Sequence, residues 1–212
     1  MPDTPATDWT RYYEKPFPAA RLTRRITGRI LVNILSSAGF PAGGSIIELG
    51  GGNSAFCDSF VRQFRASHYT VVDRNPRGVE LFKAKHPGTE TKAVCADVFE
   101  LDTASFGGAD LVLSVGLVEH FPEEQTKIAI RRHFELAKPG GLVLITFPTP
   151  TFTYRLIRRA AEMLGIWRFP DECPIPLEDA VRLCAEHGEI VAQRLNRAIL
   201  LTQGIVLARK PR

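Results

Sequence analysis

Between residues 45 and 147, short apolar runs alternate with longer segments whose apolar residues recur at helical spacing. The apolar runs are rich in β-branched residues, which predicts strands, while Phe56, Phe60 and Phe64 in one intervening segment predict a helix. Asn75 followed by Pro76 is typical of a helix start. Because helices alternate with apolar strands, we expect a mainly parallel sheet covered on both faces. The predicted strands span residues 45–49, 69–73, 92–95, 111–115 and 142–147.

The chain ends differently. A helix over residues 177–187, stopped by Gly188, precedes two β-like runs at 189–195 and 199–208. A helix followed by a hairpin at the end of a parallel sheet implies an antiparallel edge pair. The expected fold class is therefore α/β: a doubly wound, Rossmann-like, seven-stranded sheet with a C-terminal antiparallel hairpin and an N-terminal helical arm.

A glycine cluster directly after the first predicted strand is the most informative motif. In Glu48-Leu49-Gly50-Gly51-Gly52 the backbone can approach a ligand closely, at the sheet edge where such folds bind ligands. Asp73 ends the next strand, where its carboxylate can accept hydrogen bonds from both hydroxyls of a ribose. These residues predict a nucleotide-containing cofactor, with a glycine turn that binds nothing and a hydrated Asp73 as the alternatives.

Two classes of cofactor fit this arrangement. Residues 50–55 satisfy the relaxed G-x-G-x-x-A fingerprint, so a nicotinamide or flavin enzyme has to be considered. Three features favour S-adenosylmethionine. The charge of Glu48 would face a dinucleotide pyrophosphate unfavourably but could orient an amino-acid group. Asp97, after the third strand, suits an adenine amino group, and the terminal hairpin is unlike the usual dinucleotide strand order.

With these motifs the chain resembles the class I S-adenosylmethionine-dependent methyltransferases, in particular the type 11-like small-molecule group. The resemblance spans residues 45–147, with weaker support to residue 209, and departs from the commonest motif at Ser54, where the family has a third glycine. It implies S-adenosyl-L-methionine as the cofactor. The pieces that carry it are residues 48–52, 71–73, 96–98, 110–114, 119–121 and 136–141.

The resemblance also implies positions for the cofactor's parts. The methionine end is expected at the glycine turn, the ribose at the end of the second strand, the adenine after the third strand, and the sulfonium above the end of the fourth strand. In this family a segment before the core commonly folds across the cofactor, so a tyrosine of the arm can cap it, with simple aromatic packing as the alternative. The implied cofactor residues are Glu48, Gly50, Gly51, Gly52, Asp73, Arg74, Asp97, Val98, Ser114, Val115, Gly116 and Tyr13.

Two residues after the fourth strand are the candidate catalytic groups. Methyl transfer is a direct displacement that mainly needs donor and acceptor held in line. A hydroxyl or phenol acceptor also benefits from a general base, and His120 lies at the expected active-site edge with a pKa suited to proton transfer. Glu119 is expected to orient His120 or contact the cofactor. A scaffolding role for His120 is the alternative.

Composition narrows the class of protein. Of 212 residues, 44% are hydrophobic and 24% charged, as in a globular protein, and no segment predicts a membrane span or a secretory signal. We expect a cytoplasmic protein. Its four cysteines have no metal-ligand spacing, so we expect no metal site. The cysteines are Cys57, Cys95, Cys173 and Cys184.

The net charge of +4 is unevenly distributed. Residues 1–40 hold six basic and three acidic side chains, and residues 151–170 hold four and one, so each segment carries +3 and the remainder −2. Residues 21–35 and 153–164 both predict amphipathic helices, and in the second Tyr154, Ile157, Ala161 and Leu164 should oppose the arginines. Such segments fit an acidic or lipid-linked acceptor or peripheral contact with an anionic membrane surface. A solvated helix face is the alternative, and nucleic acid is not expected.

We therefore expect one methyltransferase domain over residues 1–212. Its parts are an N-terminal arm or cap (1–40), a cofactor-binding core (41–148), a lid-like insert (149–175) and the last helix with the hairpin (176–212). The predicted reaction is transfer of a methyl group to a small-molecule acceptor, at oxygen or nitrogen rather than carbon. A nicotinamide-dependent oxidoreductase and a non-catalytic cofactor-binding partner or sensor protein are the alternatives.

Overall fold

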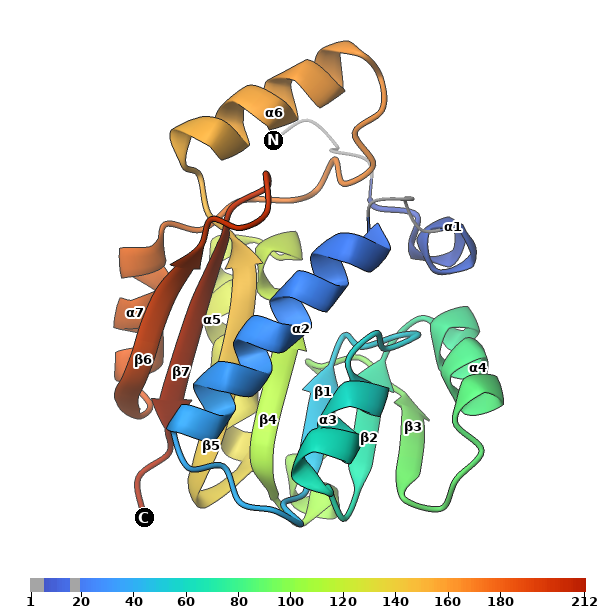
Figure 1. Cartoon of the computed structure of the whole chain (residues 1–212), viewed down its shortest axis with the longest axis vertical. Coiled ribbons are helices and arrows are strands. Elements are labelled where there is room, and N and C mark those ends of the chain that lie inside the picture. Colours follow the sequence, from blue (N-terminus) through green and yellow to red (C-terminus); the bar gives the residue numbers. More distant parts are fainter. Residues whose placement is uncertain (1–5, 16–19) are drawn as a thin grey trace.

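The computed structural model describes residues 6–15 and 20–212 and contains a seven-stranded sheet (Figure 1). The strand order is β3-β2-β1-β4-β5-β7-β6. Neighbouring strands are parallel except for β7, which is antiparallel to both β5 and β6. The predicted fold class is confirmed. The strands are β1 (Ile46–Leu49), β2 (Tyr69–Asp73), β3 (Thr91–Cys95), β4 (Ala109–Val115), β5 (Ala137–Pro148), β6 (Glu189–Asn196) and β7 (Gln203–Arg209).

Helices cover both faces of the sheet. One apolar cluster joins the sheet to α2 (Ala20–Ser37), α3 (Cys57–Phe64) and α4 (Pro76–Lys85). The other joins its opposite face to α5 (Glu123–Leu136) and α7 (Leu177–Ala185). The central strands β1 and β4 are mainly apolar on both sides because each side is buried under a helix layer. The edge strands β3 and β6 are partly exposed. Among the described residues, no helix is long and apolar enough to cross a membrane.

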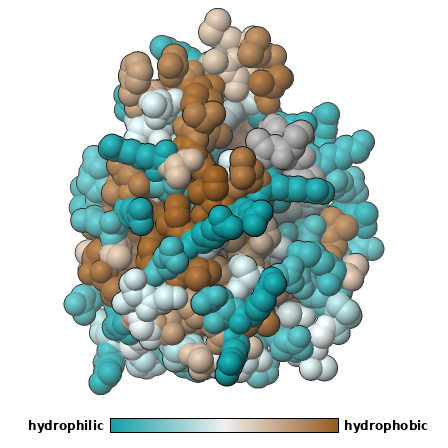
Figure 2. Space-filling view, viewed as in Figure 1, coloured by the Kyte–Doolittle hydropathy of each residue, from teal (hydrophilic) through white to brown (hydrophobic). Residues whose placement is uncertain are grey.

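The two remaining α-helices lie beyond the carboxyl ends of the parallel strands. α1 (Trp9–Glu14) is at the β2 side of this edge, and α6 (Phe152–Met163) lies above the sheet (Figure 1). Two short 3-10 helices, η1 (Thr103–Phe106) and η2 (Val118–His120), flank β4. Figure 2 shows apolar side chains gathered on the upper part of this face, where Figure 1 places α6.

Several element boundaries differ from the prediction for local reasons. The helix predicted from Phe56, Phe60 and Phe64 begins at Cys57. Just before it, the Ser54 hydroxyl accepts hydrogen bonds from the backbone N–H groups of Phe56 and Cys57, at 3.1 and 3.2 Å, which hold the chain in a turn. β5 begins at Ala137, directly after α5, five residues earlier than expected.

The prediction for the second amphipathic segment is wrong in part. Leu164 lies just beyond the end of α6 and is exposed rather than packed on the protein. Arg158, expected on the solvent side, points inward instead, donating to the backbone carbonyl of Glu172 at 2.8 Å. β7 also begins at Gln203 rather than at residue 199, because residues 197–202 form the turn of the hairpin.

Candidate functional site

The glycine turn follows β1 at the carboxyl edge of the sheet, as the sequence predicts. Gly50 and Gly52 have φ values of +68° and +44°, which disfavour any residue with a Cβ atom. A Cβ on Gly50 would also lie 2.8 Å from the Leu117 side chain, and one on Gly51 2.9 Å from the Glu48 carboxyl group. The turn therefore depends on glycine for its backbone conformation and for its close packing.

Glu48 is buried beneath this turn. Its Oε2 atom accepts a hydrogen bond of 2.7 Å from the Tyr69 hydroxyl. Burial raises the pKa of Glu48, although hydrogen bonds from Ser54 and Tyr69 oppose the shift. Ser54, where the family's commonest motif has glycine, is itself buried and ties the turn to the first residues of α3. The hydrogen bonds of its hydroxyl group accommodate a serine at this position of the turn.

Asp73 ends β2 beside the glycine turn and is also buried. One carboxylate oxygen accepts the Asn75 backbone N–H at 2.7 Å, and the other accepts the Tyr13 hydroxyl at 2.8 Å. Burial raises the pKa of Asp73, while these hydrogen bonds oppose the rise. The Tyr13 ring packs directly over Gly52, where a Cβ would lie only 2.1 Å from the ring. Tyr13 therefore makes the contact that a ribose hydroxyl would make with Asp73.

The residues predicted for the adenine lie next along the same edge. Arg74, Asp97 and Val98 line one cleft together with Asp73 and Tyr13. Asp97 Oδ1 accepts the backbone N–H of Phe99 at 2.9 Å, and Arg74 Nη1 lies 3.9 Å from Asp97 Oδ2. Asp97 and Val98 thus line the same space, and their adenine role stays a prediction.

Of the three residues predicted to contact the cofactor at the end of β4, only two line the site. Val115 and Gly116 line a larger cavity of about 420 Å³, next to Gly50 and Gly51. Ser114 is fully buried within the sheet and lines neither space, and its Oγ atom has no hydrogen-bond partner among the described residues. Ser114 is therefore placed behind the cavity wall.

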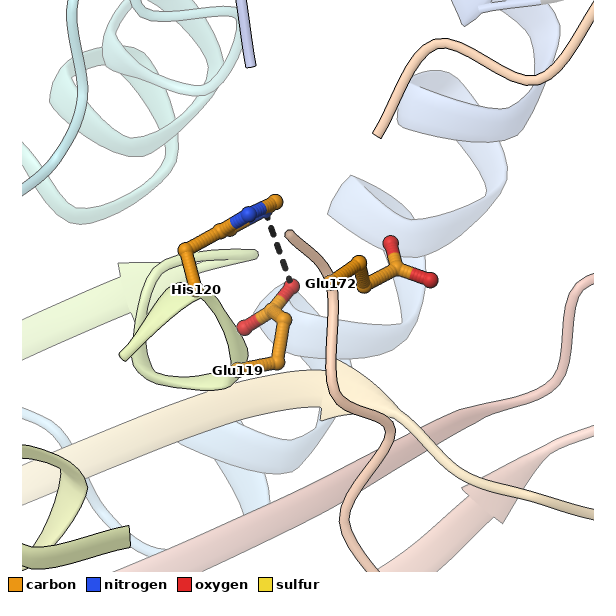
Figure 3. Close-up of side chains that lie close together, drawn as sticks. All are labelled: Glu119, His120 and Glu172. Carbon is orange, nitrogen blue, oxygen red and sulfur yellow. Dashed lines mark ion pairs between the residues drawn. The ribbon is translucent and has the colours of Figure 1, made fainter. Parts of the chain in front are cut away.

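The two predicted catalytic residues lie in η2, directly after β4. His120 Nδ1 lies 3.0 Å from Asp171 Oδ1, and His120 Nε2 lies 3.9 Å from Glu119 Oε1. Burial opposes the charged imidazole, but the Asp171 hydrogen bond and the Glu119 charge raise the pKa of His120 overall. Burial raises the pKa of Glu119 to about 7. In Figure 3 the Glu119 carboxylate faces the His120 ring.

Asp171 connects this pair to the N-terminal arm. The backbone N–H of Thr7 donates to Asp171 Oδ2 at 3.1 Å, and the Thr7 hydroxyl donates to Oδ1. Burial opposes ionisation of Asp171, but the hydrogen bonds from His120 and Thr7 hold its pKa well below its usual range. Trp9 meets the His120 ring edge-on, with centroids 4.8 Å apart. The arm and the segment after α6 therefore close over His120 together.

Glu172, the next residue, points a second carboxylate toward the site. It is buried, and the Tyr154 hydroxyl of α6 donates a hydrogen bond to its Oε1 atom. Burial raises the pKa of Glu172, which the Tyr154 hydrogen bond opposes. Nearby, the backbone N–H of Cys173 donates to the Glu119 carbonyl at 2.8 Å. This bond fixes the segment after α6 against η2.

The cleft and the cavity meet at a small set of shared residues. The cleft extends toward Asp97, and the cavity extends under α6 toward apolar and aromatic side chains of α6 and of the segments after it. A group bound in the cleft and a second group bound in the cavity would therefore come together beside His120. The shared residues are Trp9, Tyr13, Gly50, Gly116 and His120.

One group of side chains has the spacing of a metal site. Ligand atoms of Glu119, His120 and Glu172 lie within 4.8 Å of one another (Figure 3), which the cysteine spacing could not have indicated. The Glu172 carboxylate already accepts from Tyr154, and His120 already uses Nδ1 on Asp171. His120 Nε2 and the Glu119 carboxylate remain directed toward one another, an arrangement that also suits proton transfer.

Several residues of this site were not predicted from the sequence. Asp171 and Glu172 lie in the predicted insert, and Trp9 lies in the predicted arm, but none had been given a role. Two adjacent carboxylates after an otherwise basic segment were the available signal. Their contacts with His120 and Glu119 span about fifty residues of sequence, and no spacing rule reaches that far.

Comparisons with known proteins agree with this geometry. A family model described as a methyltransferase domain matches residues 12–188. The chain is 30% identical over 108 residues to the chloroplastic 2-methyl-6-phytyl-1,4-hydroquinone methyltransferase of Arabidopsis thaliana, covering 50% of this chain and 31% of that protein. It is 25% identical over 179 residues to the malonyl-[acyl-carrier protein] O-methyltransferase of Priestia megaterium, covering 82% of this chain and 64% of that protein. The chain thus spans about a third of the length of the first relative and less than two thirds of the length of the second.

Among solved structures, the fold is similar to that of magnesium protoporphyrin IX methyltransferase from Synechocystis PCC 6803 with bound S-adenosylhomocysteine. The TM-score is 0.73 at 15% identity, over 95% of this chain and 92% of that one. The similarity to this structure shows that the chain has the fold of a methyltransferase, and the family model shows the family. The chain belongs to the methyltransferase-domain family. The nicotinamide alternative receives no support.

Proposed function

We propose that this enzyme transfers a methyl group to an oxygen atom of a mainly apolar small molecule, with His120 as the general base. The observation that supports this most is the position of His120, at the junction of the cleft and the cavity. Because Asp171 accepts from Nδ1, the neutral imidazole carries its lone pair on Nε2. That atom is the one available to a group in the cavity.

The residues present fit the cofactor. Asp73 offers carboxylate oxygens beside a glycine turn that admits close approach, and the cleft continues toward Asp97. When bound, S-adenosylmethionine supplies an electrophilic methyl group and departs as a neutral thioether. The protein's part is to hold the acceptor oxygen in line and to accept its proton at His120 Nε2. Asp171 then stabilises the charged imidazole that results.

The lining of the cavity supports a mainly apolar acceptor. Phe56, Ile157, Trp167 and Leu201 give it a largely apolar lining, while Glu119, Glu172 and His120 gather at the end near the glycine turn. Such a cavity fits an apolar body carrying one protic group. The names of the two relatives describe a phytyl-substituted hydroquinone and a carrier-bound malonyl group, both of which contain oxygen functions.

The direct test is transfer of a labelled methyl group to matched acceptors. A series of alkyl-substituted phenols, carboxylic acids and anilines of equal chain length would be incubated with the enzyme and labelled S-adenosylmethionine. We expect labelled ethers or esters in preference to labelled amines. Exclusive labelling of the amines would contradict transfer to oxygen, and binding of cofactor without any transfer would favour a sensor or partner role.

Replacing Asp171 with asparagine should move the pH profile of kcat/KM. Transfer requires neutral His120, so activity falls as pH drops through the pKa of His120. That pKa is held above its ordinary value partly by the hydrogen bond that His120 donates to Asp171. In D171N the acid limb should therefore move to lower pH, and the plateau should fall about tenfold because the imidazole is less well oriented. An unchanged limb would show that Asp171 does not act through His120.

Removal of metal ions separates proton transfer from cation binding at Glu119, His120 and Glu172. If these residues serve acid–base chemistry, dialysis against EDTA should leave kcat unchanged, since no bound cation takes part. Loss of activity that is restored by Mg²⁺ or Mn²⁺, but not by either ion in the Glu172→Gln variant, would instead assign the three side chains to a cation site.

A further inference from the structure

Exposed large apolar side chains are concentrated around one opening of the molecule. Of the eight found among the described residues, only Val191 lies elsewhere, on β6. The other seven, between 59% and 86% exposed, come from three segments that are far apart in the sequence: the start of α2, α6 with the turn after it, and the β6–β7 turn. We call these seven the apolar rim: Leu22, Phe152, Leu156, Met163, Leu164, Ile166 and Leu200.

All three segments also line the cavity beside His120. Thr23 is next to Leu22 in α2, Ile157 is next to Leu156 in α6, and Ile199 and Leu201 flank Leu200. In each segment, one residue faces the cavity while its neighbour is exposed. The apolar rim is therefore continuous with the cavity mouth. Figure 2 shows apolar side chains extending from the top of the molecule down the middle of this face.

Helix α6 is apolar on two sides. Tyr154, Ile157 and Ala161 line the cavity. Phe152, Leu156 and Met163 recur at intervals of four and seven residues, which places them together on the exposed side. A helix that merely covered the cavity would show a polar outer face. The outer face of α6 instead carries these three apolar side chains together with the exposed Arg155 and Arg159, the mixture found on amphipathic interfacial helices.

The charges around the apolar rim have one sign. Exposed arginines accompany it on all three segments, and Glu162 is the only acidic residue within residues 20–30, 152–166 and 197–203. Glu162 is paired with Arg158, whose Nε lies 2.8 Å from Glu162 Oε1. The face therefore presents unneutralised positive charge beside apolar side chains. The exposed arginines are Arg21, Arg25, Arg29, Arg155, Arg159 and Arg197.

We propose that the apolar rim docks on an anionic lipid bilayer. Its apolar side chains enter the boundary between headgroups and acyl chains, and the arginines contact lipid phosphates. The arginines alone would suit an anionic bilayer and a soluble acidic protein equally well. The large exposed apolar side chains favour the bilayer. Docking would turn the cavity mouth toward the membrane, so that an amphiphilic acceptor could enter without crossing water. Lipid binding needs no turnover, and the proposal therefore goes beyond the enzymatic activity.

Cosedimentation with extruded vesicles tests this proposal. One set would contain phosphatidylcholine alone and the other about 30% phosphatidylglycerol. We expect binding to the anionic vesicles, weaker binding to the neutral ones, and a loss of binding as salt rises. The pair Phe152→Ser and Met163→Ser should weaken binding by about tenfold or more, since both side chains are wholly outside the cavity. Arg155→Gln with Arg159→Gln should weaken it only on anionic vesicles.

Matched controls lie on β6. Val191→Ser and Arg194→Gln remove an exposed apolar and an exposed basic side chain away from the apolar rim and should leave vesicle binding unchanged. His120→Gln should bind vesicles like the wild type, so that a failure of the proposed catalysis cannot be mistaken for a failure of docking. Absence of vesicle binding would overturn the proposal. Two other results would also overturn it. One is a concentration-dependent dimer, and the other is binding of an acidic acyl carrier protein in place of vesicles, in each case abolished by the Phe152 and Met163 changes.

Discussion

Replacing His120 with glutamine is expected to lower kcat by about 10²- to 10⁴-fold, the usual contribution of a positioned general base. Glutamine can still donate a hydrogen bond to Asp171 but cannot accept a proton from the acceptor. His120 lines the cleft where it meets the cavity, and glutamine keeps a polar side chain there, so the affinity for S-adenosylhomocysteine should stay within about twofold of the wild-type value. Single-turnover kinetics and calorimetric titration would measure the two quantities.

The pH profile distinguishes a base from a scaffold. In the wild type, kcat/KM should fall on the acid side as His120 gains a proton, whereas H120Q should lack that limb. Glu119, whose pKa burial raises to about 7, lies 3.9 Å from His120 Nε2, so the two groups interact and the wild-type limb belongs to the pair rather than to one residue. His68→Gln, an exposed histidine at the opposite end of β2, is the matched control. Full activity of H120Q would show that His120 is not the general base and has a structural role.

The fold was predictable because its signals are local. The central parallel strands are apolar runs buried on both faces. Asn75 caps α4 through a 2.9 Å hydrogen bond from the Gly78 backbone N–H, as the sequence pattern indicated. Boundaries were less predictable where a side chain competes with the backbone, as Ser54 does at the start of α3. The true start of β7 depended on a turn whose apolar residues Ile199 and Leu200 look like strand.

The candidate site divides along the same line. The positions of the glycine turn and of the carboxylates at the strand ends could be predicted from the sequence, because a parallel sheet brings the carboxyl ends of its strands to one edge. The groups that close over that edge do not follow from sequence. Thr7 reaches Asp171 across 164 residues, and Asp171 reaches His120 across 51. These contacts depend on how the arm and α6 pack, which periodicity does not specify.

Asp73→Ala should weaken binding of S-adenosylmethionine by about 10- to 150-fold, which corresponds to a lost hydrogen bond to a charged group of about 1.5–3 kcal/mol. The carboxylate is held at the end of β2 beside the glycine turn, where a ribose diol would find both of its oxygens. Calorimetry with S-adenosylhomocysteine measures the change. Asp102→Ala, an exposed carboxylate that caps η1, is the control and should leave affinity unchanged. Unaltered affinity in D73A would mean that another group binds the ribose.

Tyr13 makes this prediction sharper because its hydroxyl already donates to Asp73 at 2.8 Å. A ribose hydroxyl must share or displace that bond, so Tyr13→Phe should tighten cofactor binding by about 2- to 10-fold, the worth of one net hydrogen bond. The retained ring keeps its packing on Gly52. If competition for Asp73 is the cause, Y13F should have no effect in the D73A background. Weaker binding in Y13F alone would show instead that the hydroxyl contacts the cofactor directly, as a capping tyrosine does.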